Sequence, residues 1–307
     1  MNKLFDIPEL FFHHVPEADL FQILLLSQGE RYKHHIFENY TDIDFFMEPN
    51  AKKFKFSDIS EWNHFDCLDF QILTQKEAMA YPFKSLVEYF ISSDYLIYLC
   101  LDTFEIPFYE TYQQEHAVHD CILCGINQGQ LLCYDYYDFL KPEFQYISFE
   151  DLYKGFSNMQ SVTYTPINER FRRPEFAALK LKENYDRAPD IGKIKNDLQK
   201  GPHRKLDYLL IHIENVIEQR EELYLKHFNF LYSYLKVTSE KMKFYGWENK
   251  VYYDLVDRAY ILLFKALKYS VKMKFDKDKL IEVYDLAKDV LQRFYMEIEH
   301  TIDQIIQ

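Results

Sequence analysis

The stretch "EHAVHDCILCGINQGQLLCYDYYD", residues 115–138, has the pattern of a β-hairpin in which two apolar runs flank a turn with one glycine. A glycine there provides the left-handed backbone conformation that a three-residue loop, Asn127–Gly129, requires. With this loop, Cys121 pairs with Asp135 across the hairpin. Because side chains alternate along a strand, His119 and Asp135 then share one face of the sheet. The hairpin therefore predicts a histidine beside an aspartate.

The length of the turn decides which aspartate reaches the imidazole. A two-residue loop reverses the alternation and favours Asp138 in place of Asp135. An aspartate beside the ring fixes the tautomer of the imidazole, so that the other ring nitrogen can deprotonate a thiol or a hydroxyl. The same spacing also fits a buried structural histidine that is paired with a carboxylate. The residues alone leave these two interpretations open.

Composition indicates a globular protein and excludes several classes. The chain has 307 residues, of which 48% are hydrophobic and 28% charged, and its net charge is −13. A nucleic-acid partner requires a clustered basic surface, which this charge opposes. The longest apolar run, around Ile23–Leu26, is far too short for a membrane span, and the start of the chain lacks a signal-peptide pattern. Five cysteines without framework spacing favour a reducing cytoplasm. We therefore expect a cytoplasmic protein with neither a nucleic-acid partner nor a membrane segment.

The first part of the chain alternates helix and strand patterns. A buried helix is predicted at Ala18–Ser27, and Ser148 has the place of an N-cap residue between a strand and a helix. Further patterns predict a helix at 81–94, a buried strand at 95–106, a strand followed by a helix at 144–156, and a strand at 176–186.

The last part of the chain is helical throughout. Apolar residues recur at helical spacing in three long patterns, Leu206–Lys236, Val251–Met273 and Lys277–Ile306. The turn-forming run "DRAPD" at 186–190 precedes them. The sequence therefore predicts an α+β domain with an antiparallel sheet over residues 1–188 and an all-α helical domain over residues 189–307.

The segment 81–155 resembles the papain-like family typified by the butirosin-biosynthesis acyltransferase, which is related more distantly to bacteriocin-leader peptidases. The spacing of 16 residues between His119 and Asp135 fits the pattern of that family. The resemblance implies a papain-like fold for the first domain. It also implies that His119 and Asp135 are catalytic and that His116 and Asp102 support them. The matching positions are Asp102, Pro107, Tyr112, His116, His119, Gly125 and Asp135.

The resemblance also implies a cysteine nucleophile at the start of the first long helix, where the helix N-terminus lowers the pKa of a thiol. Such proteins move an acyl group from a carrier-protein phosphopantetheine thioester to the cysteine and then to an amine. Counting back from Gly29 places the nucleophile near Val15–Glu17, where the chain has no Cys, Ser or Thr. The first cysteine, Cys67, is a displaced candidate.

No metal or other cofactor is expected. Cys121 and Cys124 are three residues apart on a strand, so they point to opposite faces, and no second ligand pair has suitable spacing. The adjacent pairs His13–His14 and His34–His35 cannot both face one metal ion on a helix or a strand.

Three hypotheses for the function remain. The first is a natural-product biosynthesis protein of the papain-like acyltransferase family without a cysteine nucleophile, which works as a binding or scaffold subunit or as a base-only catalyst. The second is an active acyltransferase that uses Cys67. The third is a helical-bundle interaction protein whose first domain is purely structural. The candidate partners are an acyl or peptidyl carrier protein and a second copy of the chain. Whether the chain is an enzyme or a pseudoenzyme stays open.

Overall fold

The computed structural model describes residues 2–11, 16–39, 43–48, 51–56, 65–135, 142–159, 174–200, 203–220, 222–247, 249–271 and 275–306. The chain forms two compact units. The first comprises Met1–Lys33 and Ser60–Arg187, and the second comprises His34–Ile59 and Ala188–Gln307. The second unit thus includes a segment from within the range 1–188, which the sequence predicted to be one continuous domain.

The first unit contains a seven-stranded sheet in which all paired strands are antiparallel. The strand order is β4-β9-β5-β6-β7-β8, and β1 pairs with β6. The predicted antiparallel sheet is therefore confirmed. The strands are β1 (Lys3–Leu4), β4 (Leu68–Leu73), β5 (Leu96–Asp102), β6 (Val118–Asn127), β7 (Gln130–Asp135), β8 (Glu143–Ile147) and β9 (Phe176–Leu181).

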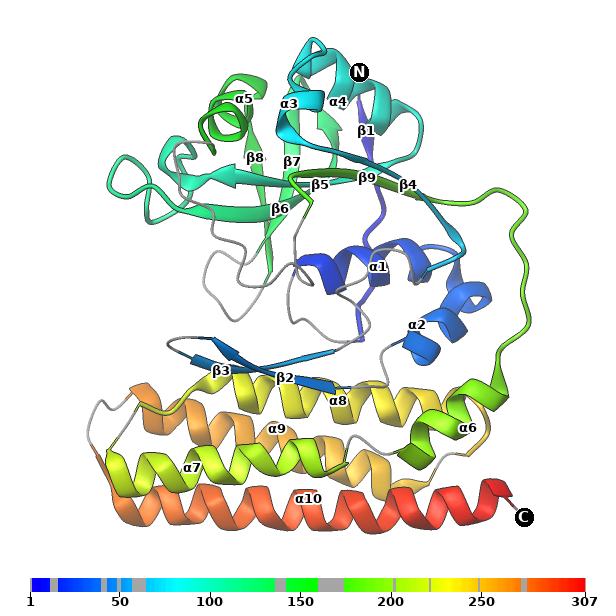
Figure 1. Ribbon diagram of the computed structural model, residues 1–307, viewed down its shortest axis with the longest axis vertical. Helices are drawn as coiled ribbons and strands as arrows, with labels where there is room; N and C mark the ends of the chain where they lie inside the picture. Colours follow the sequence, from blue (N-terminus) through cyan, green and yellow to red (C-terminus); the bar gives the residue numbers. More distant parts are fainter. Residues whose placement is uncertain are drawn as a thin grey trace. The chain divides into compact units, whose positions relative to one another are not determined.

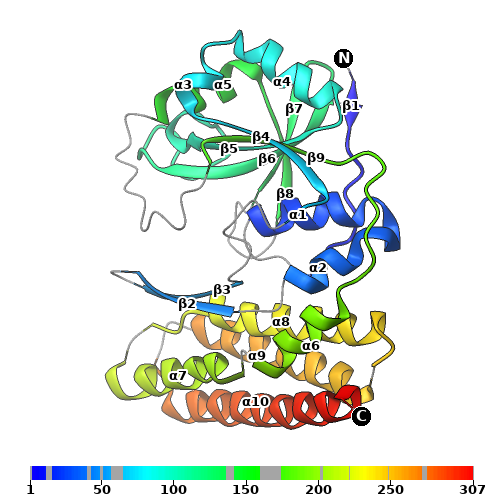
Figure 2. The same cartoon turned by 45° about the vertical axis from the view of Figure 1, so that its right-hand side comes forward.

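Helices cover both faces of this sheet (Figures 1 and 2). One face carries α3 (Gln75–Ala78), α4 (Phe83–Ser92) and α5 (Phe149–Asn158), and the opposite face carries α1 (Pro16–Leu26). Because both faces are covered, the central strand β5 is buried along its whole length. This explains why its sequence is a continuous apolar run and not an alternating one.

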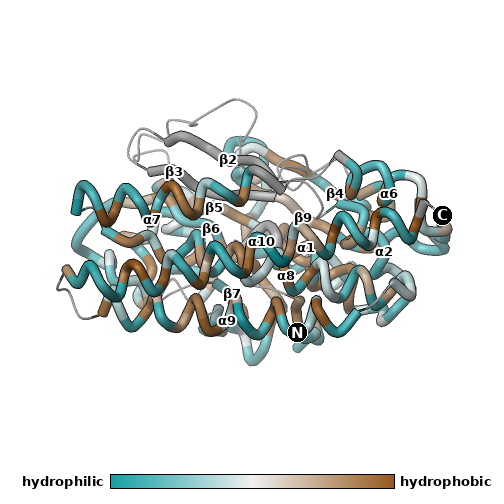
Figure 3. Tube along the Cα trace, turned by 90° about the horizontal axis from the view of Figure 1, so that it is seen from below, coloured by the Kyte–Doolittle hydropathy of each residue, from teal (hydrophilic) through white to brown (hydrophobic). Residues whose placement is uncertain are grey.

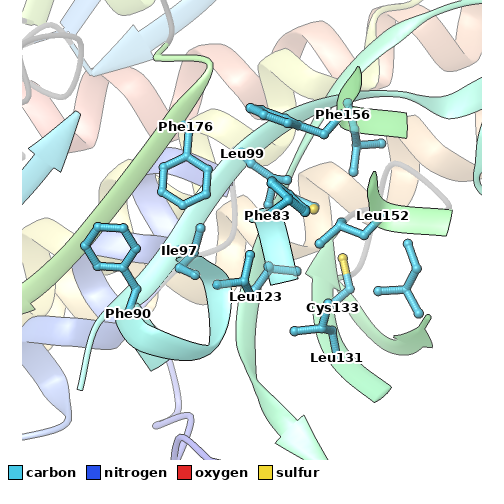
Figure 4. Packing of buried hydrophobic residues seen from close by; sticks show 14 of the residues in the cluster. Phe83, Phe90, Ile97, Leu99, Leu123, Leu131, Cys133, Leu152, Phe156 and Phe176 are labelled. Carbon is cyan, nitrogen blue, oxygen red and sulfur yellow. The ribbon is translucent and has the colours of Figure 1, made fainter. Parts of the chain in front are cut away.

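The core between the sheet and helices α4 and α5 is rich in aromatic rings (Figure 4). Phe156 stacks on Phe83 with ring centroids 5.1 Å apart and contacts Phe176 edge-on. Leu99 and Leu123 extend this cluster across the central strands. Each such side chain contributes roughly 1.5–3 kcal/mol when it is fully buried, so this cluster is a main source of stability for the sheet.

Local capping explains where two of these helices begin. The Ser148 hydroxyl accepts a hydrogen bond from the backbone N–H of Asp151, as predicted for an N-cap residue. Thr74 and Glu77 form a reciprocal capping box at the start of α3. These bonds satisfy N–H groups that have no partner within the helix.

The β6–β7 hairpin has a two-residue turn, so the predicted three-residue loop is wrong. Asn127 pairs with Gln130, and both turn residues have positive φ, 50° for Gln128 and 81° for Gly129. This combination matches the twist of the two strands. The register then shifts by one residue between Leu123 and Gly125. This β-bulge cancels the effect of the shorter turn, so the strands beyond it keep the predicted register.

The backbone at Gly125 explains why a glycine is present in the middle of β6. Its φ is 144°, which side chains rarely allow, and a Cβ there would lie 2.3 Å from the carbonyl oxygen of Lys3. Lys3 belongs to β1, which pairs with β6 at this point. The glycine therefore permits both the bulge and the close approach of the first strand.

In the second unit, every regular element described after residue 188 is a helix, as predicted. The β2–β3 hairpin, Ile43–Glu48 and Ala51–Phe56, belongs to the same unit and lies near α8 and the 3-10 helix at His203–Asp207. The helices are α2 (Lys33–Asn39), α6 (Ile191–Lys200), α7 (Tyr208–Gln219), α8 (Leu225–Phe244), α9 (Lys250–Val271) and α10 (Lys277–Ile306).

One of the three predicted helical patterns is divided. The pattern at Leu206–Lys236 contains the end of α7 and the start of α8. Arg220 ends α7 in the left-handed conformation, with a φ of 58°. Because glycine usually occupies this conformation, an arginine at this position did not predict the end of a helix.

Candidate active site

His119 and Asp135 lie side by side on adjacent strands at one end of the sheet. His119 is the second residue of β6, and Asp135 is the last residue of β7. The imidazole Nε2 is 3.1 Å from Oδ1 and 3.0 Å from Oδ2 of Asp135. The predicted pairing of these two side chains is therefore confirmed. The alternative partner, Asp138, lies outside the described residues.

The two side chains of the pair differ in their access to solvent. The Asp135 carboxylate is fully buried, whereas 33% of the His119 side chain is exposed. A carboxylate accepts hydrogen bonds and donates none, so Nε2 of His119 carries the proton and Nδ1 carries the lone pair. Nδ1 is therefore the atom that can accept a proton from another molecule.

Tyr109 is a third member of this group, which the sequence analysis did not identify. Its hydroxyl donates a hydrogen bond to Oδ2 of Asp135. Its ring meets the His119 ring edge-on at 5.3 Å. Tyr112, which matches the family pattern, has its hydroxyl bonded to the Gln113 amide. No spacing rule distinguishes Tyr109 from Tyr112, because both lie in the irregular segment after β5.

His116 and Asp102, the two predicted supporting residues, pair with each other. The His116 Nδ1 lies 2.6 Å from Oδ2 of the fully buried Asp102, and half of the His116 side chain is exposed. The other carboxylate oxygen accepts the backbone N–H of Phe104, whose ring stacks on His116 at 4.2 Å. This second pair orders the chain just after β5 and just before β6.

The pair of His119 and Asp135 lies on the opposite face of the sheet from helix α1. His119 lies two residues before Cys121 on β6, and Asp135 lies two residues after Cys133 on β7, so all four side chains share one face of the sheet. Cys121 and Cys133 belong to the core beneath α4 and α5. Tyr134 points the other way, and its hydroxyl donates to Asp19 of α1 at 2.8 Å. The first long helix therefore approaches the sheet from the side away from the imidazole.

The position that the resemblance gives to the nucleophile lies at the start of this helix. Helix α1 begins at Pro16, within the predicted range of residues 15–17. Val15 lies outside the described residues, and so do the side chains of Pro16 and Glu17. None of the three residue types has a nucleophilic side chain of the cysteine, serine or threonine kind.

Cys67, the displaced candidate, is far from His119 within the sheet. It precedes β4, which is separated from β6 by β9 and β5. Three strand spacings are about 14 Å, and the strand registers displace the two residues by roughly a further 26 Å along the strands. Burial also raises the pKa of the Cys67 thiol to about 12. Cys67 and His119 therefore do not form a nucleophile–base pair.

The other cysteines also lack the character of a catalytic thiolate. All five are buried. Cys121 is two residues from His119 on the same face, but the neighbouring Cys133 thiol and burial raise its pKa. Burial likewise raises the pKa of Cys124. A reactive cysteine needs partial exposure and a lowered pKa, and these thiols have the opposite environment.

One of the two adjacent histidine pairs, neither of which was expected to bind a metal ion, lies within the described residues. His34 and His35 are buried in α2 with ring centroids 4.1 Å apart. His13 and His14 lie outside the described residues.

No protein-family model matches the chain, and no curated protein matches it. Among the described helices, none combines the length and apolar character that crossing a membrane requires. The function must therefore be inferred from the geometry of the residues themselves.

Proposed function

We propose that this chain is a natural-product biosynthesis protein of the papain-like acyltransferase type that works without a covalent acyl-enzyme. It binds an acyl or peptidyl carrier-protein thioester, and His119 acts as a general base toward the amine that receives the acyl group. One observation carries the proposal: a partly exposed imidazole is oriented by a fully buried carboxylate. This is the arrangement that a general base requires.

The proposed reaction is direct aminolysis of the thioester. The amine nitrogen attacks the thioester carbonyl while Nδ1 of His119 takes a proton from that nitrogen. The carbon–sulfur bond then breaks, and the leaving thiolate of the carrier takes the proton back from the imidazolium. Asp135 stabilises the imidazolium between these two steps, with Tyr109 holding the carboxylate in place. A positioned base of this kind contributes about 10²–10⁴-fold to a rate.

Two observations support a noncovalent mechanism over a covalent one. The thiols of Cys67, Cys121 and Cys124 have raised pKa values, so they are protonated at neutral pH. Helix α1, which carries the nucleophile in the family that the sequence resembles, contacts the face opposite to His119 through Asp19 and Tyr134.

The test uses the full chain, an acyl-loaded carrier protein and a simple amine. Intact mass spectrometry should show no acyl adduct on the chain. Amide formation should fall about 10²-fold in His119→Ala, with the exposed His300→Ala as the control that keeps its activity. A covalent adduct that disappears in Cys67→Ala would contradict the proposal, and so would equal rates in the His119 and His300 variants.

A second candidate function is that of an interaction protein whose first unit is structural. Exposed aromatic and aliphatic side chains along α9 favour it. In that case His119→Ala leaves every measurable function unchanged, whereas substitutions on α9 do not.

A further inference from the structure

The exposed side chains of α9 form one continuous stripe. At about 100° per residue, they fall within an arc of roughly 120° around the helix. Figure 3 shows that apolar positions recur along α9. The apolar members and their exposed fractions are Tyr253 (41%), Tyr260 (57%), Ile261 (50%), Phe264 (48%) and Val271 (72%).

Most of this stripe is separate from the face with which α9 packs inside its own unit, and only Tyr260 among its members has a described ring contact there, with Tyr232 of α8 at 5.7 Å. The buried face consists of Tyr252, Leu255, Ala259, Leu262 and Ala266. Those residues face the neighbouring helices α8 and α10. A helix that packs on one side normally presents polar residues on the other, so a second apolar stripe indicates a second surface to be covered.

Asp257 and Lys268 flank the middle of the stripe, and they differ from the other charged residues between Tyr253 and Val271. Arg258 is 2.6 Å from Asp289, and Lys265 is 3.4 Å from Glu282, so both are paired with α10. Within the described part of the chain, Asp257 and Lys268 have no ion-pair partner. Lys268 lies over the ring of Phe264, with its Nζ 4.5 Å from the centroid.

The order of these residues is symmetric. Ile261 follows Asp257 by four residues, and Phe264 precedes Lys268 by four residues. A two-fold axis through the centre of this segment therefore brings Asp257 opposite Lys268 of a second copy, and Ile261 opposite Phe264. Such self-complementarity is the condition for an isologous dimer.

We propose that this stripe is an interface between two copies of the chain, in which two α9 helices pack antiparallel. The antiparallel arrangement forms two Asp257–Lys268 ion pairs around an apolar centre, and it aligns the helix dipoles favourably. A parallel arrangement instead sets Asp257 against Asp257 and Lys268 against Lys268. The two charged residues therefore favour a second copy of the chain as the partner, and they favour the antiparallel arrangement of the two helices.

The size of the stripe sets the strength of the dimer. From Tyr253 to Val271 it is about 27 Å long and one helix wide. The area that a stripe of these dimensions can bury is smaller than the roughly 800 Å² per partner that a standard stable interface buries. We therefore expect a weak, concentration-dependent dimer with a Kd in the micromolar range or above.

Sedimentation equilibrium of the full chain at about 10–300 µM, a range that brackets such a Kd, tests the interface. The weight-average mass should rise toward that of a dimer, and Phe264→Glu should raise the Kd at least about tenfold by placing a charge in the apolar centre. Ile211→Glu is the matched control, because Ile211 is 43% exposed on α7, which packs mainly on α10 and on the 3-10 helix at His203–Asp207. A monomer at every concentration, or equal effects of both variants, overturns the proposal.

A charge exchange tests whether the partner is a second copy. Asp257→Lys and Lys268→Glu should each raise the Kd about tenfold, because each puts like charges face to face at both ends. The double variant restores both ion pairs in exchanged form and should recover the Kd to within about threefold. A double variant as weak as the single ones overturns self-association through this stripe.

Cross-linking tests the direction of the two helices. All five native cysteines are buried, so a single introduced cysteine is the accessible target for a short bismaleimide. In the antiparallel pair, Ile261→Cys lies close to its copy, whereas the two copies of Val271→Cys are about 25 Å apart along the axis. Cross-linking of the Ile261 variant alone supports the arrangement. Efficient cross-linking of the Val271 variant overturns it.

Discussion

One histidine in each unit shows how surroundings give the same side chain different properties. His119, in the sheet unit, is one-third exposed and bonded to a buried carboxylate. His227, in the helical unit, is 3% exposed, and its ring lies 4.8 Å from that of His212. Burial and the neighbouring His212 lower the pKa of His227 to about 3. His227 is therefore neutral at physiological pH.

The hydrogen-bond partner and the access to solvent therefore determine the role of each imidazole. The Nε2 of His212 accepts the backbone N–H of Tyr224 at 3.0 Å, which suits a neutral ring. His212 and His227 in the helical unit are therefore held by a hydrogen bond to the backbone and by the contact between their rings. The end of the sheet instead provides a carboxylate that stabilises a positive charge on His119. The first arrangement is structural, and the second suits proton transfer.

The largest effect that we predict is acid destabilisation of the helical unit through His227. Its pKa is about 3 in the folded chain and about 6.5 in the unfolded chain. Between these values the unfolded state binds more protons, so the stabilising contribution is complete above pH 6.5 and is lost as the pH falls toward 3. Over the whole range the loss amounts to roughly 5 kcal/mol, of which roughly 3 kcal/mol falls between pH 6.5 and pH 4. Urea unfolding followed by circular dichroism between pH 4 and 7.5 measures it.

The variant His227→Phe isolates this contribution from the titration of carboxylates. Phenylalanine keeps a ring in the same place but has no titrating group, so stability should depend less steeply on pH below 6.5. His300→Ala, a change at an exposed histidine of α10, should keep the native slope. If His227→Phe and the native chain have equal slopes, the buried neutral state of His227 is refuted.

Disturbing the register that brings His119 to Asp135 should also destabilise the chain. Gly125→Ala should lower the free energy of unfolding by about 3 kcal/mol, because its Cβ meets the Lys3 carbonyl and its φ is positive. Gly129→Ala has positive φ but open space around the Cβ. It should therefore lose only about 1 kcal/mol. Equal losses in the two variants would argue against the bulge.

Removing the buried carboxylate of Asp135 should have a smaller effect than the changes at His227 and Gly125. Asp135→Ala should destabilise the sheet unit by about 2 kcal/mol, because His119 and Tyr109 lose their acceptor. Asp135→Asn keeps one acceptor oxygen and should lose about 1 kcal/mol. Chemical unfolding followed by near-ultraviolet circular dichroism provides the measurement.

The control for this experiment is Glu150→Gln, which removes the charge of an exposed ion pair with Lys154. Exposed pairs of this kind contribute little, so the free energy of unfolding should stay close to that of the native chain. A loss in Asp135→Ala as small as that of Glu150→Gln would show that the buried carboxylate does not hold this end of the sheet.

The elements that the sequence predicted well are those with a strong local signal. The continuous apolar run at 95–106 predicted the buried strand β5, and the apolar spacing at 81–94 predicted α4. Ser148 was predictable as an N-cap because its hydroxyl acts within one helical turn. In each case the information lies within about ten residues of the chain.

The elements that escaped prediction depend on distant contacts or on strained backbone. The bulge in β6 accompanies the pairing of Gly125 with Leu4, more than a hundred residues earlier in the chain. The break between α7 and α8 follows from a left-handed Arg220, a residue type that rarely adopts this conformation. Neither has a local sequence signature, because the rest of the fold imposes both.

The candidate site was predicted in part, and for a partly wrong reason. His119 and Asp135 share a face as expected, but the unpredicted bulge compensates for a turn that is one residue shorter than expected. Tyr109 escaped because its contact depends on an irregular segment that folds back on the end of β7. Alternation along a strand is readable from sequence, whereas the path of such a loop is not.

The strand order has a consequence for synthesis of the protein on the ribosome. β9 lies between β4 and β5, although it is the last strand of the sheet to be translated. Until residue 181 has emerged, β4 lacks the strand with which it pairs, and the β9 side of β5 stays open. Unpaired strand edges invite association with other chains. A nascent chain that stalls after α5 is therefore more exposed to aggregation than one that has extended past β9.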